Sequence, residues 1–223
     1  MYILMNINKI LRQSFLFVNK YSLPFKDRLF ENLTKNTYND IFLKNPDRFW
    51  TEHSKILDHI IDRIDKNSKI LDLWCWNGKD SLWLAKQWML IDAVDLSEES
   101  IKIISTRINE EIKNNIILHQ SSIRKYLHNN TKEYNLISCN NSLQFDFDWF
   151  SRIKEIQDYT LVWWYNTLSW PLGIPWWDWY WNYLNKEKIL NLYQDREVIF
   201  IEESDYKKWD IDCQRLSFIA QKR

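Results

Sequence analysis

Apolar runs that suit buried strands alternate with segments that suit helices from residue 69 onward, and this order constrains the fold more than any other feature. The strand-like runs lie at 69–73, 89–95, 115–120 and 133–140, and each is short and apolar enough for a strand covered on both faces. Strands that alternate with helices pair in parallel, because each helix carries the chain back across the sheet. The order therefore predicts an α/β fold with an open, mainly parallel sheet and helices on both faces.

The end of the chain adds three strands to this prediction. A run at 165–169 continues the alternation, and the runs at 196–204 and 213–223 are close enough in sequence to pair antiparallel. We therefore expect a doubly wound, Rossmann-like sheet of seven strands, mainly parallel, with an antiparallel last strand.

Residues 1 to about 65 have a helical character instead. Within 52–68 the apolar residues recur at helical spacing; they are Ile56, Leu57, Ile60, Ile61 and Ile64. The first 19 residues are apolar in patches that charged side chains interrupt, which favours an amphipathic helix over a signal peptide or a membrane span. We expect a helical N-terminal extension over 1–45, positioned to cover the binding cleft as a lid, and one α/β domain over 46–223.

Ligands of such sheets bind beyond the carboxyl ends of the strands, so the loop after the first strand is the first place to look. The stretch "KILDLWCWNGKD" places Asp72 near the end of the strand and Trp74, Cys75, Trp76 and Gly78 in the loop. A loop that closely approaches a ligand needs residues without side chains and with freedom for positive φ. Tryptophan, with its large side chain, meets neither requirement.

The composition of the chain makes these tryptophans suspect. The 223 residues contain 2 Gly and 14 Trp, whereas a globular chain of this length averages about 16 glycines, which equals the two counts together. We infer that many tryptophans stand where the organism's protein has glycine, because some bacteria read the codon UGA as glycine and other genetic codes read it as tryptophan. The alternative is a genuinely tryptophan-rich binding face, for example for sugars.

With Trp74 and Trp76 taken as glycine, the stretch becomes "LDLGCGNGKD" and resembles the first motif of the class I S-adenosylmethionine-dependent methyltransferases. That motif is an acidic residue at a strand end, followed by a G-x-G-x-G loop and a helix. The resemblance implies that Asp72 lies near the charged amino-acid end of the cofactor. It also implies that Trp74, Cys75, Trp76 and Gly78 form the loop around the cofactor, and that residues 46–223 are the cofactor-binding domain.

The next strand supplies the second motif, "DAVDLS". Asp95 ends that strand about 20 residues after the loop, where an acid can accept hydrogen bonds from both ribose hydroxyls. The resemblance places Leu96 and Ser97 beside the adenosine.

The third and fourth motifs match the family less closely. The family often has an acid that accepts from the adenine amino group, and "HQSSIRKY" places Ser122 and Ile123 there. After the fourth strand, "ISCNNSLQF" places Asn140 and Asn141 near the reacting methyl group. Because serine carries no charge, the adenine contact is the weakest part of the match.

Three further tryptophans fall on positions where glycine is usual. Trp88 lies at a predicted helix-to-strand turn, and Trp163 and Trp164 lie where the family has a glycine pair before the fifth strand. The restored "GGYN" and the ending "RLSFIAQKR" look loosely like the small methyltransferases related to the tellurite-resistance and thiopurine enzymes. The family resemblance covers roughly residues 45 to 223.

The resemblance implies methyl transfer from a sulfonium to a small-molecule acceptor by in-line displacement. The sulfonium is already activated, so no catalytic base is required and we assign none; Tyr165 and Asn166 are candidates to line the substrate side. The alternative is a non-catalytic adenosyl-binding or interaction protein on the same fold. A nicotinamide dinucleotide is less suitable, because it favours G-x-G-x-x-G.

Charge and cysteine content bound the remaining possibilities. Lys+Arg and Asp+Glu are both 30, which offers no electrostatic argument for a nucleic acid or an anionic membrane as a partner. Cys75, Cys139 and Cys213 are scattered, which indicates a reducing, cytoplasmic compartment and neither a disulfide framework nor a zinc site. The four histidines show no metal-ligand spacing, so we expect no metal. The irregular segment 169–185 is a candidate substrate lid.

Overall fold

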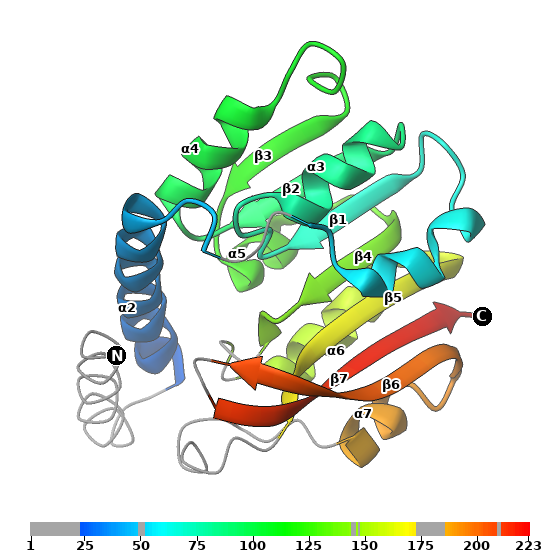
Figure 1. Ribbon diagram of the computed structural model, residues 1–223. Coiled ribbons are helices and arrows are strands. Elements are labelled where there is room, and N and C mark those ends of the chain that lie inside the picture. The colour runs from blue at the N-terminus through cyan, green and yellow to red at the C-terminus, as the bar shows by residue number, and fades with distance from the viewer. Residues whose placement is uncertain (1–22, 49–51, 144–145, 147, 173–185, 209–210) are drawn as a thin grey trace.

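The computed structural model describes residues 23–48, 52–143, 146, 148–172, 186–208 and 211–223. In this part of the chain the strands form a seven-stranded sheet in the order β3-β2-β1-β4-β5-β7-β6, with helices on both faces (Figure 1). The strands are β1 (Lys69–Leu73), β2 (Leu90–Asp95), β3 (Ile116–Gln120), β4 (Tyr134–Asn140), β5 (Thr160–Leu172), β6 (Arg196–Lys208) and β7 (Ile211–Lys222).

The directions of the strands confirm the predicted fold class. Strands β1 to β5 pair in parallel, whereas β7 lies antiparallel between β5 and β6. The antiparallel insertion follows from the short connection between β6 and β7, which leaves no room for a crossover helix. The sheet is therefore Rossmann-like, mainly parallel and antiparallel at its last strand.

The helices lie where the sequence predicts them, although some are shorter than predicted. They are α2 (Leu23–Lys44), the 3-10 helices η1 (Lys55–His59) and η2 (Ile61–Arg63), α3 (Lys79–Lys86), α4 (Glu98–Arg107), α5 (Ile123–Asn129), α6 (Trp149–Asp158) and α7 (Lys186–Leu192).

One helical segment differs from the prediction in type. The apolar spacing within 52–68 predicts a helix, and the structure has two short 3-10 helices there, separated by Ile60 with a φ of -130°. Helix α4 ends at Arg107, since Ile108 is extended. The candidate lid at 169–185 lies largely outside the described residues.

Buried side chains on the two faces of the sheet form two hydrophobic layers. Consecutive strand residues alternate between them. Leu71 belongs to the first layer, together with residues of α5, α6 and α7. Ile70 belongs to the second layer, together with residues of η1, η2, α3 and α4. The carboxyl ends of the parallel strands lie between these layers, at one edge of the sheet. That edge is where the fold can hold a ligand.

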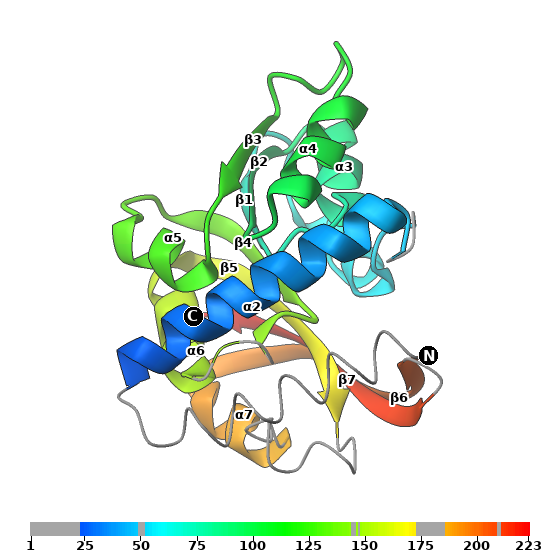
Figure 2. The same ribbon diagram turned by 90° about the vertical axis from the view of Figure 1, so that its left-hand side faces the viewer.

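Helix α2 runs across this carboxyl edge, as Figure 2 shows when compared with Figure 1. Tyr38 and Phe42 are 6% and 1% exposed and belong to the first hydrophobic layer, and the Ser97 hydroxyl donates to Asn39 Oδ1 at 2.7 Å. Helix α2 is therefore packed into the core of the sheet domain. No helix of the described residues has both the length and the apolarity that crossing a membrane requires.

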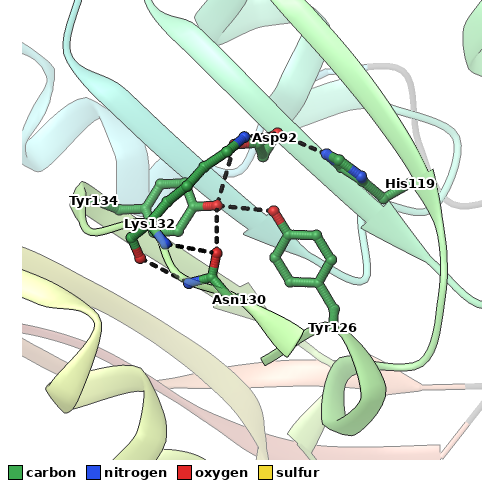
Figure 3. Close-up of polar contacts among 6 residues, drawn as sticks. All are labelled: Asp92, His119, Tyr126, Asn130, Lys132 and Tyr134. Atoms are coloured by element: carbon green, nitrogen blue, oxygen red, sulfur yellow. Dashed lines mark hydrogen bonds and ion pairs between the residues drawn. The ribbon is translucent and has the colours of Figure 1, made fainter. Parts of the chain in front are cut away.

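A polar network fastens α5 and the start of β4 to the sheet (Figure 3). Asp92 of β2 is 7% exposed and lies 2.6 Å from Nε2 of His119, 2.8 Å from Nζ of Lys132 and 3.1 Å from the hydroxyl of Tyr134. The Tyr134 hydroxyl also lies 2.8 Å from that of Tyr126. Hydrogen bonds from His119 and Lys132 lower the pKa of Asp92 in spite of its burial, so the network holds an ionised carboxylate in place.

Candidate functional site

The loop after β1 is held by main-chain hydrogen bonds to its neighbours. The amides of Trp74 and Cys75 donate to the Val94 carbonyl at 2.7 and 3.0 Å, and the Gly78 amide donates to the Cys75 carbonyl at 2.8 Å. Gly78 then caps α3 with a φ of 81°. A Cβ atom at Gly78 would come within 2.7 Å of Cγ1 of Ile104, so both the conformation and the packing require glycine there.

Three alternate residues of this loop are left-handed. Trp74, Trp76 and Gly78 have φ values of 70°, 57° and 81°. The intervening residues Cys75 and Asn77 do not have positive φ, so the backbone conformation alternates along the loop. It is the geometry expected of a loop with glycine at all three positions.

Asp95, the last residue of β2, is the acceptor at the centre of the site. Its Oδ2 accepts from the Trp76 amide at 2.9 Å and its Oδ1 accepts from the Ser97 amide at 2.8 Å. Burial raises the pKa of Asp95 to about 7, although these backbone N–H groups act in the opposite direction. Asp95 therefore joins the first and second predicted motifs directly.

Two further carboxylates, those of Asp72 and Asp80, lie where β1 meets α3. Oδ2 of Asp72 accepts from the Ser81 hydroxyl at 2.5 Å, and Asp80 accepts from the amide and the hydroxyl of Ser54 at 2.6 and 2.8 Å. Both acids are nearly buried. Burial, followed by the negative charge of Asp80, raises the pKa of Asp72 above its ordinary value. Such a pair would bind a cationic group favourably.

Asn140 at the end of β4 completes this side of the site. Its Nδ2 donates to Ser138 at 3.0 Å and to Asp80 at 3.4 Å, while its carbonyl accepts from the Trp76 indole at 3.4 Å. Among the described residues, its buried Oδ1 has no hydrogen-bond partner. A buried acceptor without a partner is uncommon and marks a place where a ligand donor could bind.

The indoles of the loop fill the space over these groups. Trp74 is 7% exposed and belongs to the first hydrophobic layer, and its ring centroid lies 6.2 Å from that of Trp76. Tyr38 of α2 packs edge-on against both rings, at 5.8 and 5.2 Å. The region between the loop and α2 is thus occupied by the protein's own aromatic side chains.

The remaining predicted residues lie at adjacent strand ends. Leu96 and Ser97 follow Asp95, and Ser97 caps α4 by accepting from the Ser100 amide. Ser122 and Ile123 follow β3, where Ser122 caps α5 and both are buried. The structure therefore brings together the ends of β1, β2, β3 and β4, which contribute all the predicted cofactor-binding residues.

Two predicted substrate-side residues lie elsewhere. Tyr165 and Asn166 pair with Leu136 and Ile137, four and three residues before the carboxyl end of β4. Asn166 is 3% exposed and donates to Thr160 at 2.6 Å. They do not line the carboxyl edge, because the strand begins earlier than expected and carries both side chains into its interior.

The two described cysteines, Cys75 and Cys139, are free and buried. Burial raises the pKa of both thiols, that of Cys139 to about 12. Neither is poised to act as a thiolate.

Several residues of the site are not predicted from the sequence. Asp80 had a local signal, since it is an acid in the first turn of a predicted helix, but its partner Ser54 lies 26 residues away. Tyr38 and Asn39 had none, because α2 reaches the site only through the folded chain. The site thus extends from the strand ends onto α2.

Comparisons with known proteins agree with this arrangement. Residues 35–172 match the family model described as tellurite resistance protein TehB. No significant match to the sequence was found among curated proteins.

Solved structures share the fold. TehB from Haemophilus influenzae superposes with a TM-score of 0.64 at 20% identity, over 83% of this chain and 67% of that chain. Magnesium protoporphyrin IX methyltransferase (ChlM) from Synechocystis PCC 6803, solved with bound S-adenosylmethionine, gives 0.67 at 11% identity, over 87% and 97% of the two chains. The cyclase SpnF gives 0.62 at 14% identity, over 75% and 80%. The fold therefore supports more than one reaction.

Proposed function

The chain belongs to the family of the tellurite resistance protein TehB, and from this membership we propose that it is an S-adenosylmethionine-dependent methyltransferase with a small-molecule acceptor. The observation that carries the proposal is the set of acids around the left-handed loop. Asp95 accepts from the loop backbone at 2.9 Å, and Asp72 lies on the adjacent strand, with both carboxylates nearly buried. Hydroxyl donors and an ammonium group are the partners that such acids favour.

The acids present the right chemistry, but the loop side chains do not fit the cofactor. The indoles of Trp74 and Trp76 lie between the loop and Tyr38, in the region that a cofactor lying against the loop backbone would need. Asp95 is only 2% exposed. The residues present at this loop therefore do not fit the cofactor, and we expect the chain with both indoles to bind it poorly.

The chain's own contribution to transfer would be positioning and exclusion of water. Helix α2 lies across the carboxyl edge (Figure 2) and is linked to α4 through Asn39 and Ser97. It can therefore shield a reaction at the strand ends from solvent. This agrees with the N-terminal region acting as a lid.

The test uses the Trp74→Gly/Trp76→Gly double variant, which removes both indoles and keeps the acids. We expect it to transfer a labelled methyl group from S-adenosylmethionine to at least one acceptor in a panel of thiols, oxyanions and amines. Asp95→Ala in the same background should weaken cofactor binding by about 1–3 kcal/mol through lost charge-assisted hydrogen bonds. Calorimetry that finds no cofactor binding by the double variant would contradict the proposal.

The competing function is a cofactor-binding protein that transfers nothing. The cyclase SpnF shares this fold, so the fold by itself does not determine methyl transfer. Ser122 also caps α5 where the family often has an acid for the adenine. Cofactor binding without methyl transfer to any member of the panel would support this second function.

A further inference from the structure

The residues that adopt left-handed backbone form an unusual set. Among the described residues, the non-glycine positions with positive φ are Asn67, Trp74, Trp76, Trp88, Asn141 and Trp163. Asparagine tolerates this conformation, whereas a bulky side chain there is an outlier. Every described position of this kind that is not asparagine is therefore a tryptophan.

Trp88 stands at a helix end that is built for glycine. The amide of Trp88 donates to the Ala85 carbonyl at 3.1 Å, and the Met89 amide donates to the Leu84 carbonyl at 3.4 Å. These two bonds form a Schellman motif, whose left-handed residue is usually glycine. The Trp88 side chain is 51% exposed, so packing does not explain the residue.

Trp163 stands in an irregular part of β5. The pairing of β4 with β5 shifts register between Tyr134 and Leu136, opposite residues 160 to 165, and Trp163 has a φ of 70°. Glycine is the usual left-handed residue of a β-bulge. Trp163 is 64% exposed, so this indole also makes little packing contact. Trp164, the other residue of the predicted glycine pair, does not have positive φ, so its backbone does not support glycine there.

The loop at 74–78 does not depend on its indoles for its conformation. Its bonds to Val94, Cys75 and Asp95 run through main-chain amides, which glycine would also provide. Removing both side chains would open the space between the loop and Tyr38. Asp95 and the unpaired Asn140 Oδ1 lie beside the vacated volume.

We propose that the functional protein carries glycine at positions 74, 76, 88 and 163, each encoded by UGA, and that Tyr38 of α2, which here packs on the indoles of Trp74 and Trp76, then forms an aromatic wall of the cofactor site. The first half of the proposal stands on backbone geometry alone. The second half rests on the proposed function.

The direct test is the codon at each position together with the mass of the corresponding peptides in protein isolated from its source organism. We expect UGA codons and peptides lighter by the difference between tryptophan and glycine. UGG at these four positions, or peptides with the tryptophan mass, would overturn the assignment.

A stability test is independent of any cofactor. Trp88→Gly and Trp163→Gly should each raise Tm by about 2–4 °C, the shift that about 1 kcal/mol of relieved backbone strain produces in a domain of this size. Trp164→Gly is the matched control and should lower Tm, because it removes a half-buried side chain from a strand without relieving a positive φ. A fall in Tm for Trp88→Gly and Trp163→Gly would count against the backbone argument.

Calorimetry with S-adenosylmethionine tests the second half. We expect binding by the Trp74→Gly/Trp76→Gly variant, none by the unsubstituted chain, and at least a tenfold loss in affinity when Tyr38→Ala is added. Stabilisation at 88 and 163 without cofactor binding would refute the proposed function and leave the glycine assignment standing. Cofactor binding by the unsubstituted chain with both indoles in place, or unchanged affinity after Tyr38→Ala, would refute the second half.

Discussion

At the scale of single residues, Asp95 shows how burial sets the chemistry of the site. Its carboxylate accepts two backbone hydrogen bonds, which favour the ionised form. Its burial favours the neutral form and is the larger effect, so the pKa rises from 3.8 to about 7. Asp95 is therefore a buried acceptor, and its ionised form lowers the stability of the folded protein.

This cost predicts a pH dependence with a definite sign. Because the folded pKa lies above the unfolded one, the folded chain binds more protons between about pH 4 and pH 7. The contribution of Asp95 to the free energy of unfolding should therefore fall as pH rises through that window. The full pKa difference of Asp95 between the folded and the unfolded chain corresponds to about 4 kcal/mol in the free energy of unfolding, at about 1.36 kcal/mol per pKa unit.

Urea unfolding of Asp95→Asn at several pH values measures this contribution. Relative to the unsubstituted chain, the variant should gain stability steadily from pH 4 to pH 7. Glu110→Gln is the control, since it also removes one carboxylate but from a side chain that is 89% exposed. Parallel profiles for Asp95→Asn and the unsubstituted chain would contradict the prediction.

At the scale of elements, α5 depends on the Asp92 network to hold its place on the sheet (Figure 3). The helix has only seven residues, too few to be stable alone. The hydroxyl of Tyr126, which α5 contributes, reaches the Asp92 carboxylate through the hydroxyl of Tyr134. The network thus links a short helix to the central strands.

A double-mutant cycle tests this link. Tyr134→Phe should cost about 1–3 kcal/mol because it leaves buried polar partners unpaired, and Tyr126→Phe should cost about 0.5–1.5 kcal/mol because one hydrogen bond is lost. If the hydroxyls act as one unit, the double variant loses less than the sum, with a coupling of about 0.5 kcal/mol or more. Strict additivity in thermal unfolding would show that the two hydroxyls act separately.

At the scale of the whole molecule, α2 belongs to the same cooperative unit as the sheet. Phe42 is 1% exposed within the first hydrophobic layer, although it lies 27 residues before the first strand. The match to the TehB family also begins within α2, at residue 35. The division into a separate extension over 1–45 and a domain over 46–223 stays a prediction, but the packing of α2 joins the two parts.

Phe42→Ala and Leu43→Ala are a matched pair of variants that tests whether α2 unfolds together with the sheet. Phe42→Ala should lower the free energy of unfolding by about 3–5 kcal/mol, the usual effect of emptying a buried phenylalanine site. Leu43 is 64% exposed, so Leu43→Ala should change it by no more than about 0.5 kcal/mol. Equal, small effects in urea unfolding would mean that α2 unfolds independently of the sheet.

The sequence by itself determined the order of the elements, the parallel sheet with its antiparallel last strand, and the acids at the strand ends. These features depend on local periodicity and on the rule that ligands bind at the carboxyl edge. The tryptophans were also conspicuous in the sequence, because Trp74, Trp76 and Trp88 fall on turns where glycine is usual. The extent of 3-10 structure at 55–63 was not predictable, since the apolar spacing suits either helix.

Only the tertiary structure decided which distant residues complete the site. Ser54 meets Asp80, Tyr38 meets the loop indoles, and Asn39 meets Ser97, and each contact joins segments far apart in the chain. It also decided which tryptophans are left-handed, separating Trp163 from Trp164. The physical reason is that side-chain periodicity reports which face of an element is buried, whereas φ values and long-range contacts depend on how the elements pack together.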